Sequence, residues 1–250
     1  MAKVKFRFRH ELKYVVDINK CNAFFEDLKE YCDFDKHADK TNSYEISSLY
    51  YDTETLRFYR DREESVGNRR KVRLRTYVSN EESSGLFIEI KERHQQFVNK
   101  KRIHLDKDNN ILDYPNHSQI PLNLVVDKLP DTAEGREMYY LNKRLELSPV
   151  VIVKYIRKAL IPKFENDMRI TLDTRITAGA SNLLKFNQNE EKYILDGHLG
   201  VLEFKSAQSM PLWLHGILNK YDFKRTRFSK YCLSVDKCYY SKKPFMTNNL

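Results

Sequence analysis

Charged and apolar residues alternate strictly near the N-terminus. In KVKFRFRHELKY, residues 3–14, every odd position is charged and four of the six even positions are plainly apolar. Successive side chains of a β-strand point to opposite faces of its sheet, so this stretch predicts a strand with one charged face. An antiparallel sheet with one face in water alternates in the same way, so the interpretation depends on whether the pattern recurs.

The pattern recurs along most of the chain. Further strands are predicted over residues 43–53, 70–78, 86–93, 150–160, 168–176 and 200–206. The charged faces consist of Lys71, Arg73 and Arg75, then Glu89, Lys91 and Arg93, then Arg169, Thr171, Asp173 and Arg175, and finally Glu203 and Lys205. With the N-terminal stretch, at least five strands therefore carry a charged face opposite an apolar one.

Fewer segments show the 3.6-residue period of a helix. Asp17 is a candidate N-cap for a helix whose apolar face consists of Cys21, Phe24, Phe25, Leu28 and Cys32. Other helices are predicted near residues 132–147, from Pro211 onwards and after Phe228. Residues 80–85, 106–123 and 178–191 are rich in polar and turn-forming residues, which predicts loops.

A closed antiparallel barrel accommodates the charged faces better than an open sheet. The predicted helices are too few to cover every apolar face if all the charged faces were in water. A barrel can instead turn its charges toward a wide lumen while helices and loops cover the outer faces. Because like charges in a confined lumen repel one another and lose hydration, a basic lumen implies a bound polyanion. The predicted fold class is α+β, an antiparallel barrel with flanking helices, as one domain over residues 1–250.

The composition also favours an anionic partner. Lys and Arg number 44 against 35 Asp and Glu, which gives a formal net charge of +9. The four cysteines form no CxxC pair and the seven histidines no HxxxH pair, so the cysteines are expected to be reduced thiols rather than zinc ligands. No apolar run approaches the roughly 18 residues of a membrane span. We expect a soluble, cytoplasmic protein without membrane insertion.

Eight short motifs, taken in order, resemble a known family. They are FRHELKY, SLYYDT, KVRLRTY, FIEIKER, YIRKAL, RITLDT, LEFK and FSKY. Together they resemble the polyphosphate polymerase domain of the vacuolar transporter chaperone (VTC) family, including its stand-alone bacterial relatives. The resemblance implies a triphosphate tunnel of the wider CYTH-like superfamily, whose lumen threads a phosphate chain. It also implies ATP and inorganic polyphosphate or triphosphate as partners, and Mn²⁺ or Mg²⁺ as the cofactor.

The resemblance further implies site residues, each matched to a position of this chain. The residues expected to act on the transferred phosphoryl group are Arg73, Arg75, Lys91, Arg157 and Arg169. Phosphate binding is expected of Lys13, of the pair Ser229 and Lys230, and of a basic position among Lys100, Lys101 and Arg102, for which we take Lys101. Glu203 matches the metal-binding glutamate of the family.

The first strand departs from the pattern of the wider superfamily. Triphosphatases and adenylyl cyclases of that superfamily usually carry ExExK there, whereas this chain has Arg9, Glu11 and Lys13 at the corresponding positions. A base therefore replaces the first acid. The replacement weakens a two-metal hydrolase interpretation and adds Arg9 to the expected phosphate-binding charges.

The stretch RTRFSKY, residues 225–231, predicts an anion site at a helix start. If Ser229 is the N-cap, the free N–H groups of the first turn lie beside Arg225, Arg227 and Lys230. The alternative is an exposed basic helix start with an ordinary cap. The family resemblance favours the anion site, with Arg227 as one of its phosphate-binding residues.

The leading functional hypothesis is a polyphosphate polymerase that moves the γ-phosphoryl group of ATP onto a growing chain. Such a reaction needs in-line positioning and charge stabilisation, which arginine forks, lysines and a divalent cation provide. One alternative is a tripolyphosphate or nucleoside triphosphate hydrolase, in which Glu11, Glu89 or Asp173 would activate water. Another is a non-catalytic polyphosphate-binding module. Glu11 and Asp173 could equally be counter-ions of the arginines, and Glu203 a salt-bridge partner of Lys205 or of an arginine across the barrel.

A single-stranded nucleic-acid binder is a weaker hypothesis. Such a protein would carry stacking aromatic side chains on the same strand face as its charges. In the first strand, Phe6, Phe8 and Tyr14 lie opposite the charges. Nucleic acid is therefore not an expected partner.

Overall fold

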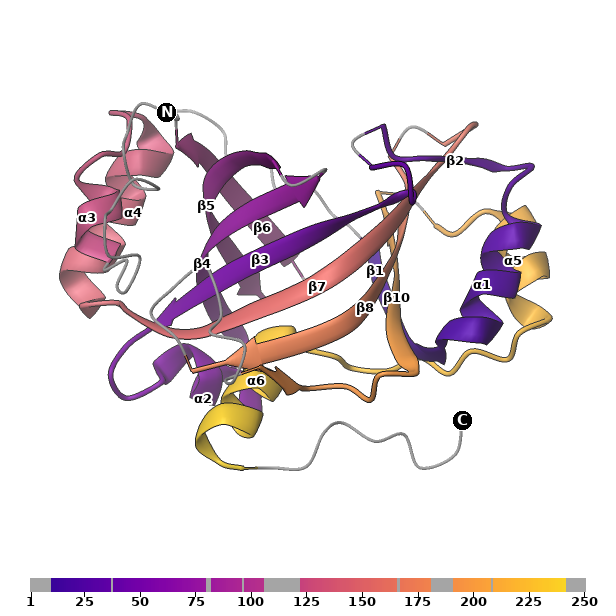
Figure 1. The fold of residues 1–250 in the computed structure, drawn as a ribbon. Helices are drawn as coiled ribbons and strands as arrows, with labels where there is room; N and C mark the ends of the chain where they lie inside the picture. Colours follow the sequence, from indigo (N-terminus) through magenta and orange to yellow (C-terminus); the bar gives the residue numbers. More distant parts are fainter. Residues whose placement is uncertain are drawn as a thin grey trace.

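The computed structural model describes residues 10–36, 38–79, 82–95, 97–105, 122–165, 167–180, 191–207 and 209–241. An antiparallel sheet curls around an inner face, and helices lie on its outer side and at its ends (Figure 1). This arrangement confirms the predicted α+β class, a barrel-like antiparallel sheet with flanking helices.

The strands and helices alternate irregularly along the chain. The strands are β1 (His10–Asp17), β2 (Cys32–Phe34), β3 (Ser43–Asp52), β4 (Asn68–Ser79), β5 (Glu82–His94), β6 (Phe97–Leu105), β7 (Ser148–Pro162), β8 (Arg169–Gly179), β9 (Lys192–Tyr193) and β10 (Leu199–Ser206). The helices are α1 (Ile18–Asp27), α2 (Arg57–Glu63), α3 (Leu122–Val126), α4 (Ala133–Leu145), α5 (Leu212–Asn219) and α6 (Lys230–Tyr239).

The sheet is a half-barrel rather than the closed barrel expected from the sequence. Its main path runs β1-β10-β8-β7-β3-β4-β5-β6, with β2 added beside β7 and β9 beside β8. Within the described residues, no hydrogen-bonded ladder joins β1 to β6. The segment that precedes α6 lies against the other edge of β1 instead, where Thr226 N donates to Lys13 O over 2.8 Å and Arg225 pairs with Tyr14. That edge of β1 is therefore engaged by a connection rather than by a strand.

Two groups of helices cover the outer face. Helices α1 and α5 pack on β1, β8 and β10, and the shared cluster includes Val16, Phe24, Leu172, Leu202 and Leu214. Helices α3 and α4 lie beside β4, β5 and β6, and their shared cluster includes Val72, Leu74, Ile88, Ile90, Val125 and Met138. In the strands these are the apolar positions of the alternation, so burying them turns the charged positions inward.

Helix α6 lies against the inner face. The hydroxyl of its N-cap Ser229 accepts from Cys232 N over 3.3 Å, so the helix begins where the sequence predicts. Tyr231 and Val235 of α6 belong to a buried cluster that includes the apolar inner-face residues Val15, Val151, Val153, Ile176, Ala178 and Val201. We call these six residues the apolar part of the inner face.

Several element boundaries differ from the predictions. Cys32 has the spacing of the α1 face, but α1 ends at Asp27 and Cys32 begins β2. Strand β5 begins at Glu82, inside the predicted loop 80–85.

The sequence predicts neither β6 nor α2, because three consecutive basic residues interrupt the alternation in β6 and α2 is only seven residues long. In β8, a register shift and a positive φ of 49° place Arg175 in an exposed position, away from Arg169, Thr171 and Asp173.

The first turns of α1 and α4 each depend on one residue. The Asp17 carboxylate accepts from Asn19 N and Lys20 N, which confirms it as the N-cap of α1. Gly135 weakens the helix pattern of α4, yet a Cβ there would meet Pro130 O at 2.1 Å. The glycine therefore allows the first turn of α4 to approach the preceding turn closely.

Candidate functional site

Charged side chains from most of the sheet share the inner face beyond the apolar part. By strand register, this charged part of the inner face consists of Glu11, Lys13, Lys71, Arg73, Arg75, Glu89, Lys91, Lys100, Arg102, Arg157, Arg169, Asp173, Glu203 and Lys205. Lys230, the first residue of α6, joins them through Asp173. All seven strand residues whose convergence the sequence predicted, namely Lys13, Arg73, Arg75, Lys91, Arg157, Arg169 and Glu203, lie on this face.

Glu89 of β5 is the centre of the first cluster. Its carboxylate is buried and accepts from Arg73 Nε and Arg102 Nε, each over 2.7 Å, and forms an ion pair with Lys100 Nζ at 2.8 Å. Arg75 lies further off, at 3.8 Å. Burial raises the pKa of Glu89, but these cations outweigh burial and hold it far below its usual range. One carboxylate thus orients guanidinium and ammonium groups from two neighbouring strands, β4 and β6.

Asp173 of β8 is the centre of the second cluster. Arg157 of β7 donates to both its oxygens, with Nε and Nη2 at 2.6 and 2.8 Å, which is the bidentate geometry of an arginine fork. Lys230 Nζ donates to the same carboxylate over 2.5 Å. Burial alone would raise the pKa of Asp173, but Arg157 and Lys230 lower it strongly. The α6 N-terminus is therefore tied to the charged part by an ion pair.

The third cluster joins strands from opposite sides of the half-barrel. Lys13 Nζ of β1 lies 3.1 Å from Glu11 and 3.4 Å from Glu203, and Lys205 Nζ lies 3.0 Å from Glu203. Lys91 Nζ of β5 reaches across to Glu11 over 2.9 Å. Strands β1 and β5 are far apart in the sheet order, so this ion pair crosses the lumen.

Glu203 meets the first requirement of a cation ligand. Its carboxylate is almost fully buried, and among the described residues its Oε1 accepts no hydrogen bond and has only the ion pair with Lys13 Nζ at 3.4 Å. Burial and the neighbouring Glu203 raise the pKa of Glu11, but Lys91 and Lys13 outweigh them, so both carboxylates have lowered pKa values. A hard divalent cation accepts such oxygens. In the described part of the chain no three His, Cys, Asp or Glu side chains gather around one point, so further ligands would have to come from phosphate or water.

Tyrosines of the inner face hold the arginines in place. Arg73 Nη1 donates to the hydroxyl of Tyr50 over 2.9 Å, Arg75 Nη2 to that of Tyr155 over 3.1 Å, and Arg169 Nη2 to that of Tyr44 over 2.7 Å. Burial raises the pKa of Tyr50, yet its arginine and lysine neighbours lower it to about 8.

These tyrosines correct one premise about nucleic acid. The alternation of the first strand places aromatic residues opposite the charges, whereas β3 and β7 place Tyr44, Tyr50 and Tyr155 on the charged face. All three rings are buried and at most 5% exposed. They therefore present no open stacking surface in this conformation.

Ser229 connects α6 to the row of lysines on β4, β5 and β6. Lys71 Nζ donates to its hydroxyl over 2.8 Å, and Lys13 Nζ lies 3.4 Å from the carbonyl oxygen of Phe228. Strand register places Lys71 opposite Lys91, and Lys91 opposite Lys100. The helix start predicted to bind an anion thus contacts Lys71, which belongs to a row of three lysines on adjacent strands.

The remaining predicted residues have different positions. Lys101 lies on the outer face, where its ammonium group binds Glu92 and Glu137, and Lys100 and Arg102 point inward; the choice of Lys101 was wrong. Arg169 forms an ion pair with Asp35 in addition to its bond to Tyr44. Arg227 is exposed, and Arg9 lies outside the described residues.

Other inner-face residues of this set were not chosen as site residues from the sequence, although Lys71 and Lys205 were placed on charged faces. Lys71 and Lys205 alternate with predicted residues on their own strands and could have been included on that signal. Lys100 and Arg102 could not be separated from Lys101 without the register of β6. Asp35 and the tyrosines carry no sequence signal that connects them to the arginines.

A comparison with family models shows to which protein family this chain belongs. Residues 8–239 match the family described as the VTC domain, which is most of the chain. The chain belongs to the VTC domain family. The resemblance inferred from the eight motifs is therefore confirmed, and no curated protein was found to match the chain.

One solved structure with a TM-score above 0.5 shows that this VTC domain has the triphosphate tunnel fold. HpAC1 from Hippeastrum, described as an adenylyl cyclase candidate with a dominant triphosphatase activity, matches with a TM-score of 0.54 and 12% identity, over 91% of this chain and 95% of that one. The PH1819 protein of Pyrococcus horikoshii matches with a TM-score of 0.47 and 14% identity, over 91% and 99% of the two chains. A candidate adenylate cyclase from Bacillus halodurans matches with a TM-score of 0.48 and 11% identity, over 89% and 95%.

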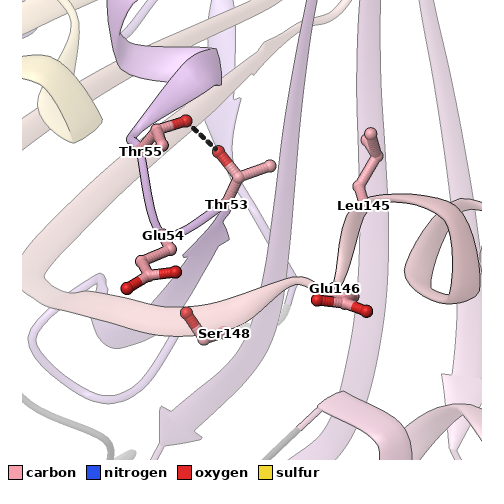
Figure 2. A pocket seen from close by; sticks show the side chains of 6 residues that line it. All are labelled: Thr53, Glu54, Thr55, Leu145, Glu146 and Ser148. Carbon is pink, nitrogen blue, oxygen red and sulfur yellow. Dashed lines mark hydrogen bonds between the residues drawn. The ribbon is translucent and has the colours of Figure 1, made fainter.

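A separate hollow of the VTC domain lies away from the charged part. Its volume is about 380 Å³. Figure 2 shows its lining at the end of β3, the end of α4 and the start of β7. Its lining consists of Thr53, Glu54, Thr55, Leu145, Glu146 and Ser148. Two carboxylates and no basic side chain make it unsuited to phosphate.

None of the described helices is long and apolar enough to cross a membrane.

Proposed function

We propose that this VTC domain is a polyphosphate polymerase that transfers the γ-phosphoryl group of ATP onto a polyphosphate chain held in the lumen. The observation that carries the proposal is the convergence of arginines and lysines from β1, β4, β5, β6, β7, β8 and β10 on one inner face. Such a surface suits a linear ligand with a negative charge on every unit. Membership of the VTC domain family supports the same substrate class.

The buried carboxylates would keep the cations ordered before the ligand arrives. Glu89 and Asp173 hold arginine forks in fixed positions, so little side-chain entropy remains to be lost when phosphate oxygens take up the remaining donors. In the reaction, Arg73, Arg75 and Arg157 would stabilise charge on the moving phosphoryl oxygens. Lys13 and Lys91 would act as compact positive charges beside them.

A divalent cation fits the carboxylates at the β1 and β10 pair. We expect Glu203, with Glu11 beside it, to hold Mg²⁺ or Mn²⁺ together with phosphate oxygens. Bound there, the cation would neutralise part of the phosphate charge that these carboxylates otherwise repel. The competing role of Glu203 is its salt bridge with Lys205. Glu203 can serve in both roles, one after the other, if the cation displaces Lys205 when it binds.

A polymerase needs no general base, because the acceptor is an already anionic phosphate terminus. A hydrolase would need a carboxylate free to accept a proton from water. Glu11, Glu89 and Asp173 are each bound by two or more cations, which lower their pKa values and make them weak bases. This observation favours transfer to phosphate over transfer to water.

The test is to incubate the protein with ATP and Mg²⁺ or Mn²⁺ and to separate long polyphosphate from orthophosphate. Formation of polymer supports the proposal. Orthophosphate alone would indicate the hydrolase, and neither product, with retained polyphosphate binding, would indicate a binding module. Arg157→Ala should lose the activity, whereas Arg144→Gln, on an exposed position of α4, should keep it.

A further inference from the structure

A second pair of arginines lies just beyond the lysine row. Arg69 of β4 and Arg93 of β5 stand directly opposite each other, two residues beyond Lys71 and Lys91 on the same faces of their strands. Two residues of a strand span about 7 Å. Like charges placed opposite each other destabilise an antiparallel pair, so the fold gains nothing from this arrangement.

These two arginines lack the internal counter-ions of the charged part. Within the described residues, Arg69 has no carboxylate partner, and Arg93 donates only to the carbonyl oxygen of Gln95, over 2.6 Å. Arg69 is half-buried and Arg93 exposed, so both guanidinium groups can be reached from solvent. Partial burial, followed by repulsion from Arg93 and Arg62, lowers the pKa of Arg69. The positive charge here is therefore uncompensated.

The pair also lies at a defined end of the lumen. Lys71 Nζ binds the hydroxyl of Ser229, so the next inner-face position of β4, Arg69, comes beside the chain that leads into α6. Arg227, two residues before Ser229, is exposed and repels Arg69. Helices α2 and α6 contact each other and lie together at this end of the sheet (Figure 1).

We propose that Arg69 and Arg93, with Arg227 beside them, form an accessory anion site that holds the part of a linear polyphosphate extending beyond the lumen. This inference rests on the proposed function, since it assumes a phosphate chain in the charged part. The row of Lys71, Lys91 and Lys100 runs across the strands one inner-face position away from the pair, so one unbranched polyanion can contact both. A triphosphate bound among Arg73 and Arg157 leaves the accessory site empty. The site therefore favours long chains over triphosphate.

The experiment compares the affinities of tripolyphosphate and long-chain polyphosphate by calorimetry at two salt concentrations. In the Arg69→Gln/Arg93→Gln double variant, the affinity for long-chain polyphosphate should fall about tenfold. The slope of log affinity against log salt concentration should become shallower by the contribution of about two phosphate contacts. Tripolyphosphate affinity should stay within about twofold of the wild type. The matched control is Lys143→Gln/Arg144→Gln on exposed positions of α4, which removes the same net charge and should change neither affinity.

Each other outcome contradicts the inference in a distinct way. Unchanged long-chain affinity, or an equal loss for both ligands, overturns the accessory site while the proposed function stands. A wild-type protein that binds neither ligand overturns the proposed function and this inference with it. Equally strong binding of single-stranded nucleic acid, lost in the same double variant, would show a nonspecific polyanion patch and overturn the assignment to polyphosphate. An unchanged thermal transition excludes unfolding, since removing like charges should not destabilise the sheet.

Discussion

The apolar and charged parts of the inner face are built on the same strands by the same alternation. In β7, Val151 and Val153 point inward near α6, and Arg157 points inward further along. In β10, Val201 and Glu203 are neighbours on the inner face. Val201 belongs to the cluster with α6, whereas Glu203 pairs with Lys13 and Lys205. The six inner-face residues that form the apolar part beside α6 are Val, Ile or Ala. The inner-face residues of the charged part lie beyond the N-terminal end of α6.

The difference shows that the inner face of a curled sheet can be stabilised in two ways. A helix with apolar side chains excludes water from one part, which gives a close-packed core. In the other part, carboxylates such as Glu89 and Asp173 satisfy the arginines, because an unpaired buried charge costs several kcal/mol. Under the proposed function, the second part can exchange internal counter-ions for phosphate, whereas the first part serves as its support.

The largest expected effect comes from placing a charge in the apolar part. Val153 is fully buried in the apolar cluster with α6, and Val153→Asp should destabilise the fold by about 3–5 kcal/mol, because the new carboxylate would lose its hydration there. Chemical denaturation measures the loss. Val153→Ala is the control for lost volume alone and should cost about 1–3 kcal/mol. A Val153→Asp variant as stable as Val153→Ala would contradict the separation of the two parts.

The next effect concerns Glu203 and turnover. Glu203→Gln should keep metal-free polyphosphate binding or tighten it, while metal-dependent turnover falls by more than about 100-fold, since a neutral amide is a poor ligand for a hard cation. Activity over a Mn²⁺ titration measures this. Glu137→Gln, an acid on the outer face, is the matched control and should behave as the wild type. A Glu203→Gln variant with normal metal dependence would remove Glu203 from the site.

A smaller effect is expected for the paired arginines of β4. Arg73→Ala and Arg75→Ala should each weaken tripolyphosphate binding by about 1.5–3 kcal/mol, because each removes charge-assisted hydrogen bonds. Calorimetry measures the affinity and a thermal transition the folding. Arg70→Ala is the control, because Arg70 lies on the opposite face of β4 and binds Glu92. If Arg70→Ala weakens binding as much as Arg73→Ala does, net charge rather than the inner face would explain the effect.

The smallest effect is a pH dependence of binding. Burial and the repulsion of Arg157 lower the pKa of Lys205 to about 8, and partial desolvation with the repulsion of Arg73 lowers that of Lys100 to about 7. Both lysines lose their charge as the pH rises, so tripolyphosphate affinity should fall up to about tenfold between about pH 7 and 9. Lys205→Arg should flatten the fall, because guanidinium stays charged in this range. An affinity that rises with pH would contradict the lowered pKa values.

The sequence predicted the elements whose pattern is local. Alternation in KVRLRTY placed Arg73 and Arg75 on one face, and Asp17 and Ser229 marked helix starts, because these signals depend only on neighbouring residues. Two regions carried a weaker signal. Three basic residues in a row left the face of Lys101 undecided, and the seven residues of α2 are too short for a clear helical period.

The sequence by itself determined which strands carry a charged face and, through eight ordered motifs, the family to which the chain belongs. Only the tertiary structure decided how those charges are balanced. Glu89 meets Arg102 across β5 and β6, Lys91 meets Glu11 across the lumen, and α6 covers the apolar part of the inner face. Such contacts join residues far apart in the chain, and strand register sets them. Register depends on the whole sheet, so no local pattern could predict them.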